Sequence, residues 1–314
     1  MTCWFVKAIC LMYLCAPPAP DSPNAIVIAE NYWSSQIVLS QILGSLLESL
    51  GYSVVFRPSD TDRQFEALGR GLIHVQLEVW EGTMKESFER ELATGRIIDV
   101  GSHDAESREE WWYPHYVEEL CPGLPDWRAL NECAHLFATM ETQPKGRFLT
   151  GPWEKYVQQR IDALGLNFVA VEAPQPDTLW SELGEAFRRK QPILMFNWTP
   201  NSVEYVYHGH FVDFPIYRPD CESIPSWGIN PDALFDCGSP RNGWIKKTVW
   251  RHFPKDWPCA YKIVQRLSLT NQMFSEIAAL IDFQGYTKVE AAEIWIQKHP
   301  EVWAAWIPAE CRQE

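Results

Sequence analysis

Ala25-Ile26-Val27-Ile28-Ala29 opens the stretch that decides the fold, because this short β-branched run predicts a buried strand. Apolar residues at helical spacing follow over 34–50. Ser53-Val54-Val55-Phe56 and Ile73 to Val79 predict two more strands, with a helix over 62–70 between them. This β-α-β-α-β order predicts a parallel sheet covered by helices.

A second alternation of the same kind follows further along the chain. Strands are expected at 147–150, 168–171 and 193–196, with helices over 153–164 and 176–190. The segments around 109–117 and 214–217 are interpreted as two crossings between the sheets. The sequence therefore predicts an α/β clamshell of two lobes, each a βαβ sheet with flanking helices.

The expected organisation has three parts. Residues 1–24 form a signal peptide and linker, 25–112 and 216–314 form a discontinuous first lobe, and 113–215 form the second lobe. The C-terminal third is expected to be helical, and Thr287-x-x-Glu290 is a capping box.

Composition excludes some classes of function. The chain has 314 residues and a net charge of −14, which argues against a nucleic-acid partner because phosphate binding needs a basic face. No apolar run long enough to span a membrane occurs after residue 25.

The N-terminus has the pattern of a secretory signal. Lys7 precedes the apolar run Ala8 to Ala16, and a proline-rich stretch follows. We expect an exported protein that is periplasmic or otherwise extracytoplasmic. Attachment to the membrane through a lipidated Cys15 stays open. A mis-assigned start or a short hydrophobic arm is the alternative.

Cysteine usage fits an oxidising compartment. Of nine cysteines, three lie in the leader and six remain, an even number that allows 15 pairings. Cys121–Cys133 is the favoured bridge, and Cys221–Cys237 is a weaker second. Buried free thiols are the alternative for each pair.

Tryptophan is the residue type that points to function, with 16 copies in the chain. Trp80 and Trp198 follow predicted strands, where open α/β sheets bind ligands, and Trp153 and Trp227 stand at turns. Indole faces attract cations, quaternary ammonium ions especially. Core packing is the alternative for all four, and equally for Trp33, which begins the first helix.

The other tryptophans are expected to be structural: Trp111, Trp112, Trp127, Trp180, Trp295, Trp303 and Trp306. Glu78 lies two residues before Trp80 and so shares its face of the strand. It could complete a cation pocket, or it could be a solvated or ion-paired residue at a strand end.

Other kinds of chemistry have weak support. His208-Gly209-His210 lacks a third metal ligand at suitable spacing, and a surface turn is the better interpretation. The chain has no Gly-x-Ser-x-Gly elbow and no P-loop. We therefore expect no catalytic residues, no metal and no cofactor.

Several longer segments together resemble a known family. They are Glu30 to Gln36, Leu50 to Val54, Ala67 to Gly71, Glu118 to Trp127, Pro192 to Pro200 and Gly243 to Lys247. Over about residues 25–308 the chain resembles the substrate-binding proteins of ABC importers for glycine betaine, choline, proline betaine and related methylated amines.

The resemblance implies a two-lobe periplasmic-binding-protein fold that closes on its ligand and docks on a membrane permease served by a partner ATPase. It implies an aromatic box to which Trp80, Trp198 and Trp227 match best. We also expect the protein to be a monomer without a nucleic-acid partner. In relatives the loop corresponding to Thr150-Gly151-Pro152-Trp153 supplies N–H groups to a ligand carboxylate. Gly151 suits that role, but Pro152 removes one donor.

The ligand stays open among methylated amines. A glycine betaine-type compound is expected first, and trimethylamine N-oxide or choline is the alternative, since the extra tryptophan at 153 resembles the trimethylamine N-oxide binders of the family. A secreted carbohydrate-binding protein, with tryptophan faces stacked on sugars, is an alternative of another class. A repurposed enzyme that uses Glu78 and a histidine of the other lobe is a third.

Overall fold

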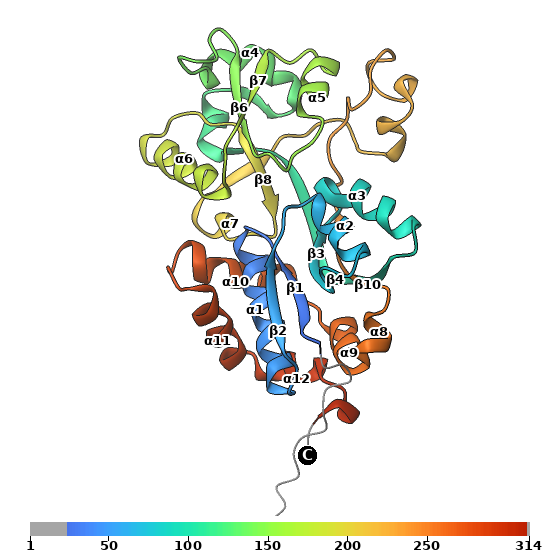
Figure 1. Cartoon of the computed structure of the whole chain (residues 1–314). Helices are drawn as coiled ribbons and strands as arrows, with labels where there is room; N and C mark the ends of the chain where they lie inside the picture. The colour runs from blue at the N-terminus through green and yellow to red at the C-terminus, as the bar shows by residue number, and fades with distance from the viewer. Residues whose placement is uncertain (1–23, 313–314) are drawn as a thin grey trace, which may run out of the picture.

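The computed structural model describes residues 24–312, which form two lobes one above the other (Figure 1). The predicted leader, with Cys3, Cys10 and Cys15, lies outside the described residues. No helix within 24–312 combines the length and the apolar character needed to cross a bilayer.

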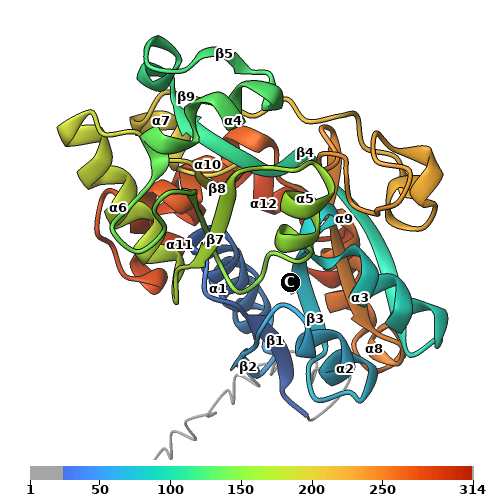
Figure 2. The same cartoon turned by 90° about the horizontal axis from the view of Figure 1, so that it is seen from above.

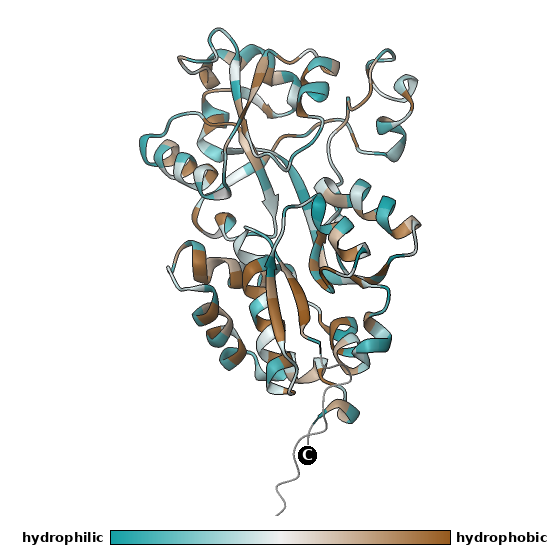
Figure 3. Cartoon of the chain, in the orientation of Figure 1, coloured by the Kyte–Doolittle hydropathy of each residue, from teal (hydrophilic) through white to brown (hydrophobic). Residues whose placement is uncertain are grey.

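Lobe 1, the lower half of Figure 1, is built on the strands predicted from the opening stretch. β1 (Ile26–Glu30) lies between β2 (Val54–Pro58) and β3 (Val75–Trp80), and all three are parallel. Their connections are the helices α1 (Ser34–Ser49) and α2 (Arg63–Gly69). The apolar residues of β1 and β2 appear brown at the centre of this lobe in Figure 3.

Lobe 2 contains the second predicted set of strands. β6 (Gly146–Thr150) pairs in parallel with β7 (Phe168–Glu172) and with β8 (Met195–Thr199). A short strand, β9 (Gly209–Phe211), pairs antiparallel with the long strand β4 (Ile97–Pro114).

β4 (Ile97–Pro114) joins the two lobes, and Figures 1 and 2 show it running from one half of the molecule into the other. It pairs with β10 (Gly243–Trp250) over residues 97–107 and with β8 over residues 108–112, antiparallel in both cases. The sequence prediction missed the first part of β4 and all of β10, because charged residues and Gly101 interrupt the apolar alternation there.

Helices cover the sheet on both lobes. On lobe 1, α1 packs against α10 (Asn271–Asp282) and α11 (Lys288–Lys298). The remaining helices are α3 (Glu81–Ala93), α4 (Leu130–Cys133), α5 (Val157–Ala163), α6 (Pro176–Arg189), α7 (Val203–Val206), α8 (Phe253–Asp256), α9 (Pro258–Arg266) and α12 (Pro300–Trp306). The capping box of Thr287 and Glu290 is confirmed.

The predicted helix over 153–164 is wrong in its first turn. α5 begins only at Val157, and Tyr156 before it has a left-handed backbone with φ of 59°. Residues 153–156 are therefore not helical, and the ring of Trp153 lies beside Tyr32 of lobe 1.

The residues 219–240 form a loop that packs on lobe 2. Phe235 stacks on Tyr156 with ring centroids 4.1 Å apart, and Asn230 Nδ2 donates to the carbonyl of Ala163 at 3.0 Å. The boundaries at 112/113 and 215/216 stay a prediction, and we propose that this loop, assigned to the first lobe from sequence, belongs with the second.

Three disulfides are present among the described residues. Cys121–Cys133 is the favoured pair of the sequence prediction and Cys221–Cys237 the second; Cys259–Cys311 was not proposed from sequence. The second bridge closes the loop 219–240, and the third ties the end of the chain to α9.

Candidate functional site

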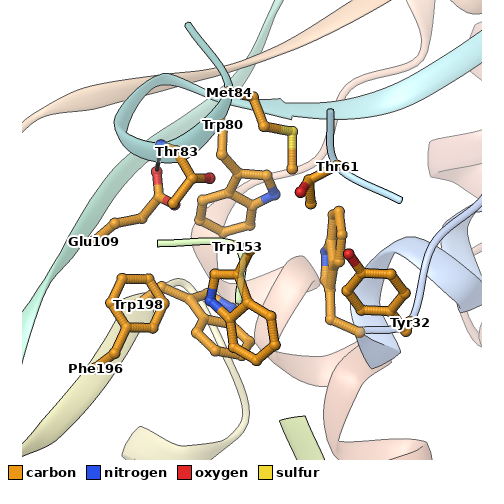
Figure 4. Close-up of a pocket in the computed structure, with 10 residues that line it drawn as sticks. Tyr32, Thr61, Trp80, Thr83, Met84, Glu109, Trp153, Phe196 and Trp198 are labelled. Carbon is orange, nitrogen blue, oxygen red and sulfur yellow. Dashed lines mark hydrogen bonds between the residues drawn. The ribbon is translucent and has the colours of Figure 1, made fainter. Parts of the chain in front are cut away.

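A pocket lies between the lobes, and most of its lining is aromatic (Figure 4). The aromatic residues are Tyr32, Trp33 and Trp80 from lobe 1 and Trp153, Phe196 and Trp198 from lobe 2. The other lining residues are Thr61, Thr83, Met84 and Glu109. The pocket therefore brings together four of the five tryptophans singled out from sequence.

Trp33 and Trp80 form the lobe 1 side. Trp33 stands at the N-cap of α1, and Trp80 is the last residue of β3, directly before α3. Both rings are nearly buried, and both indole N–H groups donate to Glu78 Oε2, at 2.7 Å from Trp33 and 3.1 Å from Trp80. A single carboxyl oxygen thus holds two rings of the pocket.

Glu78 lies behind these rings and is not part of the lining. Its side chain is fully buried on β3, and Ser35 Oγ also donates to Oε2 at 3.0 Å. Burial raises the pKa of this carboxyl to about 7, although the hydrogen bonds from Trp33, Ser35 and Trp80 oppose that rise. Its burial contradicts the alternative of a solvated residue at a strand end, and its part in a cation pocket stays a prediction.

Trp153, Phe196 and Trp198 form the lobe 2 side. Phe196 and Trp198 are two residues apart on β8 and so lie on one face of it, with ring centroids 5.9 Å apart. Trp153 meets Phe196 edge to face at 6.3 Å. Across the gap between the lobes, the ring centroids of Tyr32 and Trp153 are 6.3 Å apart, so the rings of the two lobes are in contact.

Glu109 is the one acidic residue in the lining. It lies on β4, and its Oε2 accepts from the backbone N–H groups of Gly82 at 2.8 Å and Thr83 at 3.3 Å, at the start of α3. Burial raises its pKa to about 7, while these bonds at a helix N-terminus act in the opposite direction. The carboxyl can therefore be protonated near neutral pH, and its O–H is then a donor in the pocket lining.

Gly151 permits the position of Trp153. A Cβ on Gly151 would lie 2.2 to 2.4 Å from three atoms of the Trp153 ring, so only glycine lets the indole cover this backbone. Gly151 itself is not among the lining residues.

Trp227 is not brought into this pocket. It ends the short helix η5 (Pro225–Trp227) in the loop 219–240 and is half-buried there. Among the tryptophans expected to be structural, Trp111, Trp112, Trp127, Trp295 and Trp306 are buried. Trp180 packs against the ring of Trp198 at 5.0 Å and so supports the pocket from outside.

Sequence reasoning missed part of the lining. Phe196 shares a strand face with Trp198, and that spacing could have indicated it. Tyr32, Thr61, Thr83, Met84 and Glu109 lie on segments that tertiary packing brings together, and no local pattern reveals that. Within residues 24–312 no group of three or more His, Cys, Asp or Glu side chains is arranged to hold a metal ion.

Comparisons with known proteins show what this chain is similar to. A family model described as the substrate-binding domain of the ABC-type glycine betaine transport system (OpuAC) matches residues 24–298. The trimethylamine N-oxide-binding protein of Pelagibacter ubique (strain HTCC1062) is 37% identical over 294 residues, which cover 91% of each chain.

Solved structures share the fold. An ABC-transporter choline-binding protein in complex with choline has a TM-score of 0.71 at 18% identity, with 90% of this chain and 91% of that chain covered. The glycine betaine, L-proline-binding protein ProX from Borrelia burgdorferi has a TM-score of 0.73 at 16% identity, with 92% and 98% covered. The two-lobe fold predicted from sequence is therefore confirmed.

Proposed function

Because the chain belongs to the OpuAC family, the substrate-binding domains of ABC-type glycine betaine transport systems, we propose that it captures trimethylamine N-oxide for import. The ligand would bind in the aromatic pocket between the lobes, and the loaded protein would deliver it to a membrane permease driven by a partner ATPase. The protein would act outside the cytoplasm as a monomer and would catalyse no reaction.

One observation carries this proposal: six aromatic side chains surround a pocket whose lining, within residues 24–312, includes no Lys, Arg or His. A trimethylammonium group cannot donate conventional hydrogen bonds, and ring faces are its natural receptor. Each such contact contributes roughly 0.5–2 kcal/mol, the larger value where water is excluded.

The lining favours an oxide over a carboxylate. A carboxylate has two oxygens that need several donors, and apart from the O–H of Tyr32 and the indole N–H groups the lining offers only Thr61, Thr83 and the protonated form of Glu109. Pro152, in the loop expected to supply N–H groups, has none. An oxide oxygen can be satisfied by the single O–H of protonated Glu109. The Pelagibacter relative, named for trimethylamine N-oxide, supports the same choice.

Choline is the second candidate because of Glu109 and Glu78. An ionised carboxyl in the lining, and another behind two of the rings, would favour a ligand with a net positive charge. The structurally similar choline-binding protein is consistent with such a ligand but, at 18% identity, supports only the fold. The glycan alternative has no support in the family match.

Calorimetric titration with trimethylamine N-oxide, choline, glycine betaine and a sugar tests the proposal. We expect saturable binding with one ligand per chain, tightest for trimethylamine N-oxide. Binding of the sugar alone, or of none of the four compounds, would overturn it.

A further inference from the structure

The carboxyl of Glu78 has an unusual hydrogen-bond arrangement. Its Oε2 accepts three bonds, from the indoles of Trp33 and Trp80 and from Ser35 Oγ. Its Oε1 is equally buried and has no hydrogen-bond partner within the described part of the chain. All the hydrogen bonds of this carboxyl are therefore accepted by one oxygen, and two of them fix rings of the pocket.

We propose that Glu78 is a positioning residue that also sets charge preference: Oε2 fixes the Trp33 and Trp80 rings, and the ionised carboxyl behind them favours cationic over net-neutral methylated amines. This inference rests on the proposed function, since it concerns ligands of the same pocket.

The positioning part follows from the N–H groups. An indole has a single donor at one edge, and a buried donor without a partner is costly, so the bond to Glu78 restricts how each ring can turn. Trp33 precedes α1 and Trp80 ends β3, and both rings pack in the same core cluster of lobe 1. The shared acceptor couples them.

The charge part follows from the balance of donors and acceptors. Three donors converge on Glu78, whereas a protonated carboxyl would also need an acceptor for its own O–H, and Oε1 has no partner within residues 24–312. The arrangement thus suits the ionised form. A negative charge in a site without water attracts a cation on the other side of the ring strongly, and it attracts a ligand with no net charge more weakly.

The substitution Glu78→Gln separates geometry from charge. Because all three bonds use one oxygen, the amide oxygen of Gln can accept them, and the amide nitrogen would replace the oxygen without a partner. Glu78→Ala removes both properties. Glu91→Gln is the matched control: it removes another buried carboxyl of lobe 1, one that pairs with Arg96 at 2.8 Å and does not line the pocket.

The experiment measures affinities for choline and trimethylamine N-oxide at a pH above the value of about 7 to which burial raises the pKa of Glu78. For Glu78→Gln we expect a loss of roughly tenfold for choline, as for one nearby charge, and a loss of less than about threefold for trimethylamine N-oxide. Glu78→Ala should weaken both ligands, and Glu91→Gln neither. Equal losses for both ligands in Glu78→Gln, or no loss, would overturn the charge assignment.

Indole N–H signals in nitrogen-15 NMR spectra give a readout independent of any ligand. The Trp33 and Trp80 signals should lie downfield, as for donors to a carboxylate, and both should move together in Glu78→Gln but not in Glu91→Gln. Signals that stay in place would overturn the positioning role. Wild-type protein that binds no methylated amine, yet shows these shifts, would contradict the proposed function, leave the positioning role supported and refute the charge preference.

Discussion

Lys155 of lobe 2 and Asp62 of lobe 1 form an ion pair across the gap between the lobes, with Nζ and Oδ1 2.8 Å apart. Each is close in sequence to a lining residue, Trp153 and Thr61 respectively. Beside this pair, Tyr156 Oη donates to Glu86 of α3 at 2.9 Å. These contacts join the lobes, and none of the four residues lines the pocket.

We therefore predict that Lys155→Ala weakens ligand binding by roughly two- to fivefold, the range for a partly exposed ion pair. The open state should gain population in this variant, because the ion pair that is removed joins the lobes only in the closed state. Small-angle scattering should show a larger radius of gyration at low ligand concentration. Arg128→Ala is the control, since Arg128 pairs with Asp126 inside lobe 2; an equal effect there would refute the assignment.

Trp198→Ala should weaken binding by about 2 kcal/mol or more, because it removes a ring face from the pocket. The fold should remain intact, as judged by circular dichroism. Trp227→Ala is the matched control from outside the lining and should leave affinity unchanged. A larger loss in Trp227→Ala than in Trp198→Ala would place the ligand elsewhere.

Trimethylamine N-oxide binding should weaken as pH rises through about 7. The pKa of Glu109 is raised to that value by burial, so the O–H donor to the oxide is present below it and lost above it. Glu109→Gln keeps a donor at every pH. The ratio of wild-type to variant affinity, measured across this range, should fall with rising pH; a constant ratio would show that Glu109 does not donate to the ligand.

The disulfides should differ in how much they stabilise the protein. Loop-closure entropy predicts about 4 kcal/mol for Cys259–Cys311, which are 52 residues apart, and about 3 kcal/mol for the two bridges spanning 12 and 16 residues. Denaturant unfolding of the three double Cys→Ser variants should give this order. The reverse order would mean that native contacts outweigh chain entropy.

The sequence predicted those features that local patterns determine. The strands β1, β2 and β3 were predicted from apolar and β-branched segments, and Trp80 and Trp198 lie at the carboxyl ends of strands, where open α/β sheets bind ligands. The long strand β4 could not be predicted in full, because exposed residues such as Asp104 and Glu106 interrupt its first part, while Glu109 and Glu110 are buried beside its aromatic residues in the second.

The same limit applies to the site. Glu78 shares a strand face with Trp80, as the spacing indicated, yet its bond to Trp33 depends on where α1 packs. Trp227 has the sequence surroundings of a loop tryptophan near a ligand, but the disulfide-closed loop that carries it packs on lobe 2 away from the pocket lining. Only the tertiary arrangement distinguishes such residues.

A crystal structure of the protein with trimethylamine N-oxide tests the central claim most directly. The account predicts the trimethylammonium group among the rings of Trp33, Trp80, Trp153 and Trp198, with the oxide within hydrogen-bond distance of Glu109. Ligand density outside this pocket, or an oxide turned away from Glu109 toward solvent, would contradict it.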